Sequence, residues 1–213
     1  MSSDEENDQI QDLEAIRDKI LSSSQGERMQ VSAWDDDNTG IETQRNPEDP
    51  EARAILKAAE NGNIERVTIL LDKNPELVHA TDKDGYTPLH RACYADHTKI
   101  IEVLLKRGAK IDAKTIDGWE PLHSACHWNN IESITLLIAN GANINALSNG
   151  NQTPLHLVCA SSHNSPALQL LLLHPDTNPE LVNSSGDTAQ MVATRTGKYY
   201  PMFEIIEPCL REI

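Results

Sequence analysis

The chain has 213 residues, with 33 Asp and Glu against 18 Lys and Arg, so its formal net charge is −15. This acidic balance argues against direct binding to nucleic acid, whose phosphates would repel it, and favours basic partners. The chain begins with acidic residues, and its apolar runs are short: the four leucines of residues 170–173 form one of the longest. Since a membrane span needs about 20 apolar residues, we expect no signal peptide and no membrane segment.

The first 50 residues hold 14 Asp and Glu but only 4 Lys and Arg, and few apolar residues. Such a segment cannot bury enough surface to offset its chain entropy, so residues 1–48 are predicted to be an acidic, mostly disordered tail. Apolar residues at helical spacing predict a short helix over residues 8–22, either transient and solvated or a docking element. Trp34, directly before an acidic triplet, is the candidate contact residue of this tail.

A repeated block follows the tail. Pro-Leu-His, preceded by Thr or Glu, occupies residues 87–90, 120–123 and 153–156, and Cys93, Cys126 and Cys159 share the same spacing of 33. A fixed period of this size indicates one supersecondary unit stacked on copies of itself. Pro is tolerated in the first turn of a helix, and Thr before it can cap that helix. Each block is therefore predicted to begin a helix.

This block resembles the ankyrin repeat, in which a tight turn and Thr-Pro-Leu-His open the first of two antiparallel helices. The resemblance implies an all-α ankyrin-repeat solenoid, with helix-turn-helix pairs and β-turn fingers, over residues 49–213. We divide it into an N-terminal cap repeat (49–81), two regular repeats (82–114 and 115–147), an irregular repeat (148–182) and a C-terminal cap (183–213). Degenerate end units suit a solenoid, because terminal repeats must present one face to water.

The family usually has glycine in the turn between the two helices. Gly62 keeps it, whereas Asp96, Asn129 and Ser162 replace it in the next three repeats. Asp and Asn tolerate a positive φ, so two of these replacements are conservative and Ser162 is not. The second helices are predicted over residues 99–106, 131–139 and 167–173. The family's histidine is expected to tie neighbouring repeats together.

The three His-x-x-Cys pairs raise the alternatives of a metal site and a nucleophilic site. Each pair supplies only two ligands, and stacked repeats hold successive pairs roughly 10 Å apart, too far for zinc bonds of about 2.0–2.3 Å. The cysteines occupy packing positions, and no third orienting group recurs beside them. We therefore predict no metal, no cofactor and no catalytic residue. The cysteines are expected to be reduced core thiols of an intracellular protein.

Four of the seven Trp and Tyr residues fall in the two most regular repeats. In the ankyrin family their positions are variable and face the concave groove, and Trp and Tyr are frequent hot spots of binding. The alternative is that these rings only stack on neighbouring fingers and shield a turn. With their polar surround, the predicted partner-binding residues are Tyr86, Arg91, Tyr94, Trp119, His127 and Trp128.

The resemblance implies a non-enzymatic adaptor of the nucleus or cytoplasm that is connected with gene regulation. It would bind a protein partner, basic or with a basic or apolar segment, through the concave groove. We expect a monomer that contacts neither nucleic acid nor membrane directly. A different hypothesis makes the acidic tail the active part, as a chaperone or decoy for basic proteins such as histones.

Overall fold

The computed structural model describes residues 49–160, 166–196 and 202–203. The predicted tail, with its helix over residues 8–22 and Trp34, lies outside the described residues, as does Ser162. Within the described residues the structure is helical, and an isolated bridge between Val182 and Thr188 is the only β-type pairing. The helices are α3 (Pro50–Glu60), α4 (Ile64–Lys73), the 3-10 helix η1 (Pro75–His79), α5 (Pro88–Tyr94), α6 (Thr98–Lys106), α7 (Pro121–His127), α8 (Ile131–Ala139), α9 (Pro154–Ala160), α10 (Pro166–Leu173) and α11 (Ala189–Thr196).

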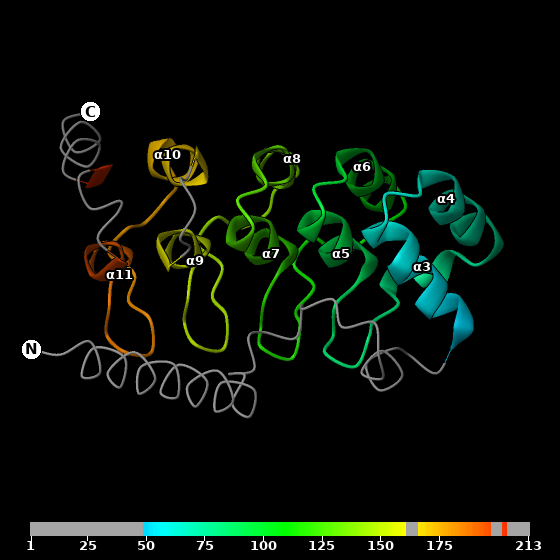
Figure 1. The fold of residues 1–213 in the computed structure, drawn as a ribbon, viewed down its shortest axis with the longest axis horizontal. Helices are drawn as coiled ribbons and strands as arrows, with labels where there is room; N and C mark the ends of the chain where they lie inside the picture. The colour runs from blue at the N-terminus through cyan, green and yellow to red at the C-terminus, as the bar shows by residue number, and fades with distance from the viewer. Residues whose placement is uncertain (1–48, 161–165, 197–201, 204–213) are drawn as a thin grey trace, which may run out of the picture. The chain divides into compact units, whose positions relative to one another are not determined.

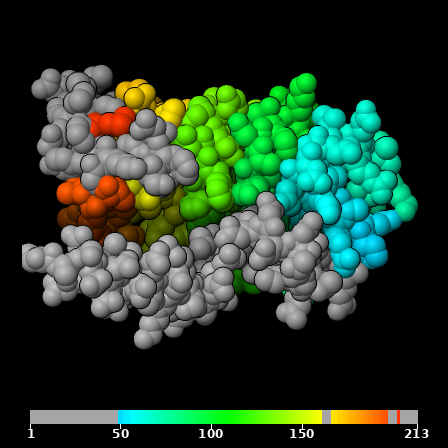
Figure 2. Space-filling model, viewed as in Figure 1, coloured from blue at the N-terminus to red at the C-terminus, as the bar shows by residue number. Residues whose placement is uncertain are grey.

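The helices form two parallel rows (Figure 1). The first helices of the repeats, α3, α5, α7, α9 and α11, lie in one row, and α4, α6, α8 and α10 lie in the other. Helix α5 packs between α3 and α7, α9 packs between α7 and α11, and each of α5, α7 and α9 also contacts the second helix of its own repeat. In the space-filling view, neighbouring repeats meet along the row (Figure 2). The predicted all-α ankyrin solenoid is confirmed.

The local sequence explains where the helices begin and end. We number the repeats in chain order, so the N-terminal cap repeat is the first and residues 82–114 form the second. In the second repeat Pro88 is the first helical residue, and the Thr87 hydroxyl oxygen accepts a hydrogen bond from the amide of His90 at 3.4 Å. Helix α3 lacks this motif, but a carboxylate oxygen of Asp49 accepts from the amide of Glu51 at 2.9 Å and caps it instead. Gly108, with φ of 86°, follows α6 and ends it, as expected for a left-handed residue after a helix.

The core runs without interruption through all repeats. It is built from inward-facing apolar residues such as Leu89, Ile101 and Leu104, all fully buried. Cys93, Cys126 and Cys159 are buried free thiols in this core. Burial raises the pKa of the Cys159 thiol to about 12, so it stays protonated and unreactive at neutral pH.

The two ends of the domain depart from the repeat. In the first repeat the segment after α4 folds into the 3-10 helix η1, which buries Leu77 and Val78. At the other end Phe203 is fully buried and belongs to the core. No helix in the described ranges combines the length and the apolar character that crossing a bilayer requires.

Candidate protein-binding surface

A ladder of buried histidines fixes the fingers, by which we mean the loops of residues 80–87, 113–120, 146–153 and 181–188 that precede α5, α7, α9 and α11. The Nδ1 atoms of His90, His123 and His156 accept hydrogen bonds from backbone amides of their own repeats at 3.1 to 3.3 Å. Because Nδ1 accepts, the proton lies on Nε2, which donates to the carbonyl oxygen of Trp119, Gln152 or Asp187 in the next finger at 3.0 to 3.1 Å. The ladder therefore holds each finger against its neighbour, as expected from the resemblance.

Burial keeps two of these rings, those of His90 and His123, neutral. Desolvation lowers the pKa of His90 to about 4, and it lowers the pKa of His123 to about 4 as well. Both ring nitrogens of each histidine are already bonded to the backbone, so neither is available to a metal ion. The His-x-x-Cys spacing is explained by packing and by this ladder.

The turn between the two helices of a repeat also links neighbouring repeats. Asp96 and Asn129 adopt positive φ angles of 57° and 59°, as predicted. The Asp96 carboxylate additionally accepts from the amide of Ser133 at 3.1 Å and from its hydroxyl at 2.6 Å, at the start of α8. Asn129 accepts from the amide of Ala167 at 3.2 Å, at the start of α10. The sequence indicated the φ angles but gave no signal for this capping of the next repeat.

Four of the six predicted partner-binding residues form one cluster of rings, which we call the ring cluster: Tyr94, Trp119, His127 and Trp128. The Tyr94 and Trp128 rings meet edge to face with centroids 5.0 Å apart. His127 lies 5.2 Å from Trp128 and 5.3 Å from Trp119, so it joins the two indoles. The cluster therefore spans the finger before α7 and the carboxyl ends of α5 and α7.

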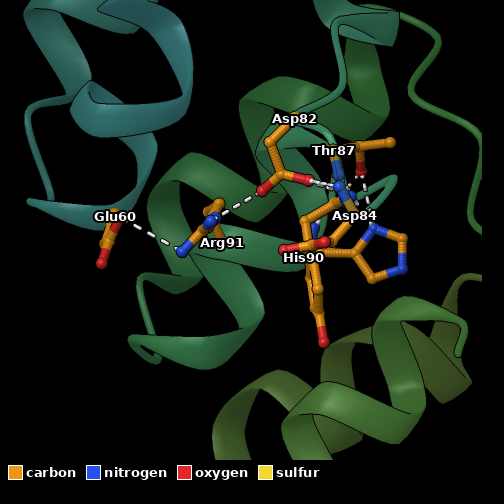
Figure 3. Close-up of polar contacts among 7 residues, drawn as sticks. Glu60, Asp82, Asp84, Thr87, His90 and Arg91 are labelled. Carbon is orange, nitrogen blue, oxygen red and sulfur yellow. Dashed lines mark hydrogen bonds and ion pairs between the residues drawn. The ribbon is translucent and has the colours of Figure 1, made fainter. Parts of the chain in front are cut away.

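Tyr86 and Arg91 lie together in the second repeat. The guanidinium carbon of Arg91 is 5.4 Å from the centre of the Tyr86 ring. Arg91 also forms ion pairs with Asp82, at 2.6 Å, and with Glu60 of α3, at 3.5 Å. Figure 3 shows Arg91 between these two carboxylates. Much of the charge of Arg91 is therefore neutralised within the chain.

The finger tips beside the ring cluster are exposed and carry carboxylates, and Lys114 on the same finger as Trp119 pairs with Glu120 at 3.7 Å. Trp128 is 38% exposed, and Ile116 at the tip of the same finger as Trp119 is 66% exposed. Asp84 and Asp117, at equivalent exposed tip positions, form no ion pair within the described part of the chain. Burial first, and then the charge of Asp117, raise the pKa of the Tyr86 phenol. From residue 115 to residue 194 the sequence contains no Lys or Arg.

Sequence reasoning missed two buried polar residues beside the cluster. Ser124 on α7 is 2% exposed, and its hydroxyl has no hydrogen-bond partner among the described residues. Glu120 stands where the other blocks have Thr; it is 6% exposed, and desolvation raises the pKa of its carboxyl. The only sequence signal for Ser124 was its place 33 residues after Arg91.

Comparison with known proteins gives one consistent result. A family model described as ankyrin repeats (3 copies) matches residues 35–115, 55–148 and 122–207. The chain is 51% identical over 169 residues to ankyrin repeat domain-containing protein 49 of Homo sapiens, covering 79% of this chain and 70% of that protein. It is 51% identical over 177 residues to the protein of the same name in Drosophila melanogaster, covering 83% and 82%. The Mus musculus protein is 50% identical over 169 residues, covering 79% and 71%.

Proposed function

Starting from the fact that this chain belongs to the ankyrin repeat family, we propose that it is an adaptor that binds a protein partner through the ring cluster and the fingers beside it. Ankyrin repeats mediate protein–protein interactions and are in general not enzymes. The single observation that carries the proposal is the ring cluster itself, in which two indoles and a phenol lie together beside an exposed, acidic finger tip. Rings of this kind are frequent hot spots of binding.

The charge of this surface supports a basic partner, or one with a basic and apolar segment. Asp84 and Asp117 are exposed without an ion pair in the described chain, and Ile116 adds apolar area between them. Opposite charges at the rim of an interface raise the rate of association and select against acidic proteins.

We take the adaptor to be a monomer of the nucleus or cytoplasm that takes part in gene regulation without touching nucleic acid. A tagged chain in cells and a sedimentation measurement test location and oligomeric state.

Alanine substitution of the four Tyr and Trp residues that are predicted to bind the partner tests the proposal. The residues to change are Tyr86, Tyr94, Trp119 and Trp128. We expect the variant to lose the proteins that the wild-type chain captures from cell extract, while its Tm changes little. A matched control is Ile69→Ala, which removes an exposed apolar side chain from α4 in the other row of helices. Loss of stability together with loss of capture would instead mean that the rings only hold the fold together.

The acidic tail supports a second candidate function. Its 14 Asp and Glu against 4 Lys and Arg in the first 50 residues suit a chaperone or decoy for basic proteins such as histones. Deleting residues 1–48 should then abolish capture, and capture should weaken steeply as salt is raised. If the tail-less chain keeps its partner and the ring variant loses it, the ring cluster is the binding surface.

A further inference from the structure

The second and third repeats place an aromatic ring at the same position of the finger. The amide of Tyr86 donates to the Asp82 carboxylate at 2.8 Å, and the amide of Trp119 donates to the Thr115 hydroxyl at 3.1 Å. The carbonyls of the same two aromatic residues accept from the amides of Asp82 and Thr115. Tyr86 and Trp119 are therefore equivalent residues on equivalent turns, although one is a phenol and the other an indole.

The two repeats differ in what lies beside that ring. In the second repeat the guanidinium of Arg91 lies over Tyr86, held by two carboxylates. In the third repeat the Trp119 ring lies against two imidazoles, those of His123 and His127, with ring centroids 6.4 and 5.3 Å away. The residue equivalent to Arg91 is Ser124, whose buried hydroxyl lacks a hydrogen-bond partner in the described chain. A buried hydroxyl without a partner costs free energy that a bound group can recover.

The fourth repeat has lost both parts of this arrangement. Gln152 stands where the ring was, and Leu157, 5% exposed, stands where Arg91 was. Only the third of these repeats therefore combines the aromatic ring with a small polar residue in the arginine position. We call Trp119, Ser124, His127 and Asp117 the Ser124 site.

The charges at the Ser124 site favour a cation. Asp117, two residues before Trp119, is exposed and forms no ion pair within the described ranges, and no Lys or Arg occurs between residues 115 and 194. The nearest cation along the chain, Lys114, pairs with Glu120 at 3.7 Å. An indole face is also the best aromatic surface for a cation.

We infer that the partner inserts an arginine side chain at the Ser124 site and places its guanidinium over Trp119, as Arg91 lies over Tyr86. This inference rests on the proposed function and names the chemistry of the partner. Arginine fits better than lysine, because its planar group can stack on an indole while it donates to the Ser124 hydroxyl and to the Asp117 carboxylate. Since Ser124 is 2% exposed, the side chains that cover it must move when the arginine enters; Trp128, at the end of α7 and 38% exposed, is the most exposed ring of the ring cluster.

The test uses the isotope-labelled full chain and three short probes, acetyl-Gly-Arg-Gly-amide and its lysine and citrulline counterparts. The Trp119 indole N–H signal should shift saturably with the arginine probe, less with lysine and not with citrulline, which keeps the shape but has no charge. Asp117→Asn should weaken the arginine probe about two- to fivefold, the effect expected of an exposed ion pair. An equal shift with citrulline would overturn the inference.

A second variant tests the site from within. Ser124→Arg should place the chain's own guanidinium over Trp119, as in the second repeat, and abolish the shift by the arginine probe, whereas Ser124→Ala should weaken it. Should Ser124→Arg not fold, the Asp117→Asn and citrulline comparisons still decide. If the Ser124→Arg variant binds the arginine probe as the wild type does, the probe does not bind at the Ser124 site and the inference fails. If it also captures the proteins that the four-ring variant loses, the proposed function stands and only the arginine inference fails.

Discussion

Mild acid should destabilise this protein through its buried histidines. Desolvation lowers the pKa of His90 and of His123 to about 4 in the folded chain, whereas an exposed imidazole has a pKa near 6.5. Between these two values the unfolded chain binds more protons than the folded one. Stability is therefore complete above pH 6.5, falls as the pH decreases through this window, and has lost the whole contribution below pH 4.

The size of the effect follows from the same values. At pH 5 the unfolded imidazole is almost fully charged, and the folded one is only about one-tenth charged, which amounts to about 2 kcal/mol for each histidine relative to pH 7.5. The two together should remove about 4 kcal/mol, a large part of the roughly 5–15 kcal/mol that holds a typical domain together. The raised pKa of Glu120 acts in the opposite direction and offsets part of this loss.

Urea unfolding followed by circular dichroism at pH 7.5, 6 and 5 measures the change in the free energy of unfolding. The His123→Asn variant is the control, because removing one of the two rings should roughly halve the slope of stability against pH. An unfolding free energy that stays constant within 1 kcal/mol from pH 7.5 to 5, or imidazole signals of His90 and His123 that titrate near pH 6.5, would refute the reasoning.

Three further predictions concern stability, measured by urea unfolding at pH 7.5. Leu104→Ala, at a fully buried core position, should cost about 2–5 kcal/mol, whereas Ile69→Ala, at a position that is 59% exposed, should cost far less. Gly118→Ala should cost clearly more than Gly108→Ala. Both glycines have a positive φ, so a side chain at either position costs about 1–2 kcal/mol. In addition, a Cβ on Gly118 would lie 2.7 Å from the backbone nitrogen of Asn149, whereas a Cβ on Gly108 would have no atom within 4 Å. Asp96→Gly leaves the buried amide and hydroxyl of Ser133 without their acceptor, which costs about 1–3 kcal/mol, but glycine also relieves the positive φ, so the net loss should be about 1 kcal/mol; a gain in stability would mean that the bonds to Ser133 contribute little.

Rules that act within one repeat made most of the fold predictable. The positive φ of Asp96 and Asn129 follows from the side chains that tolerate it, and the burial of the three cysteines follows from their common place in the period. The second helix predicted over residues 131–139 has those bounds in the structure, because its apolar spacing is local.

Apart from the histidine ladder, which the family resemblance implies, contacts between repeats could not be predicted from the sequence, because they depend on how one repeat is shifted against the next. Arg91 was expected in the polar surround of a binding surface, and the structure pairs it with Glu60, which belongs to the preceding repeat. The sequence placed aromatic residues on one face but could not show that His127 joins Trp119 to Trp128. The unbonded hydroxyl of Ser124 likewise depends on what the neighbouring side chains leave unfilled.

The most direct test of the central claim is to find where a partner touches the chain. A photoreactive phenylalanine analogue at position 116, exposed at a finger tip, is compared with the same analogue at position 69, exposed on α4. Irradiation in cells should attach a partner at position 116 and not at position 69, and the attachment should vanish when Trp119 and Trp128 are replaced by alanine. Attachment at position 69 alone, or attachment at position 116 that persists without the two indoles, would contradict binding through the ring cluster.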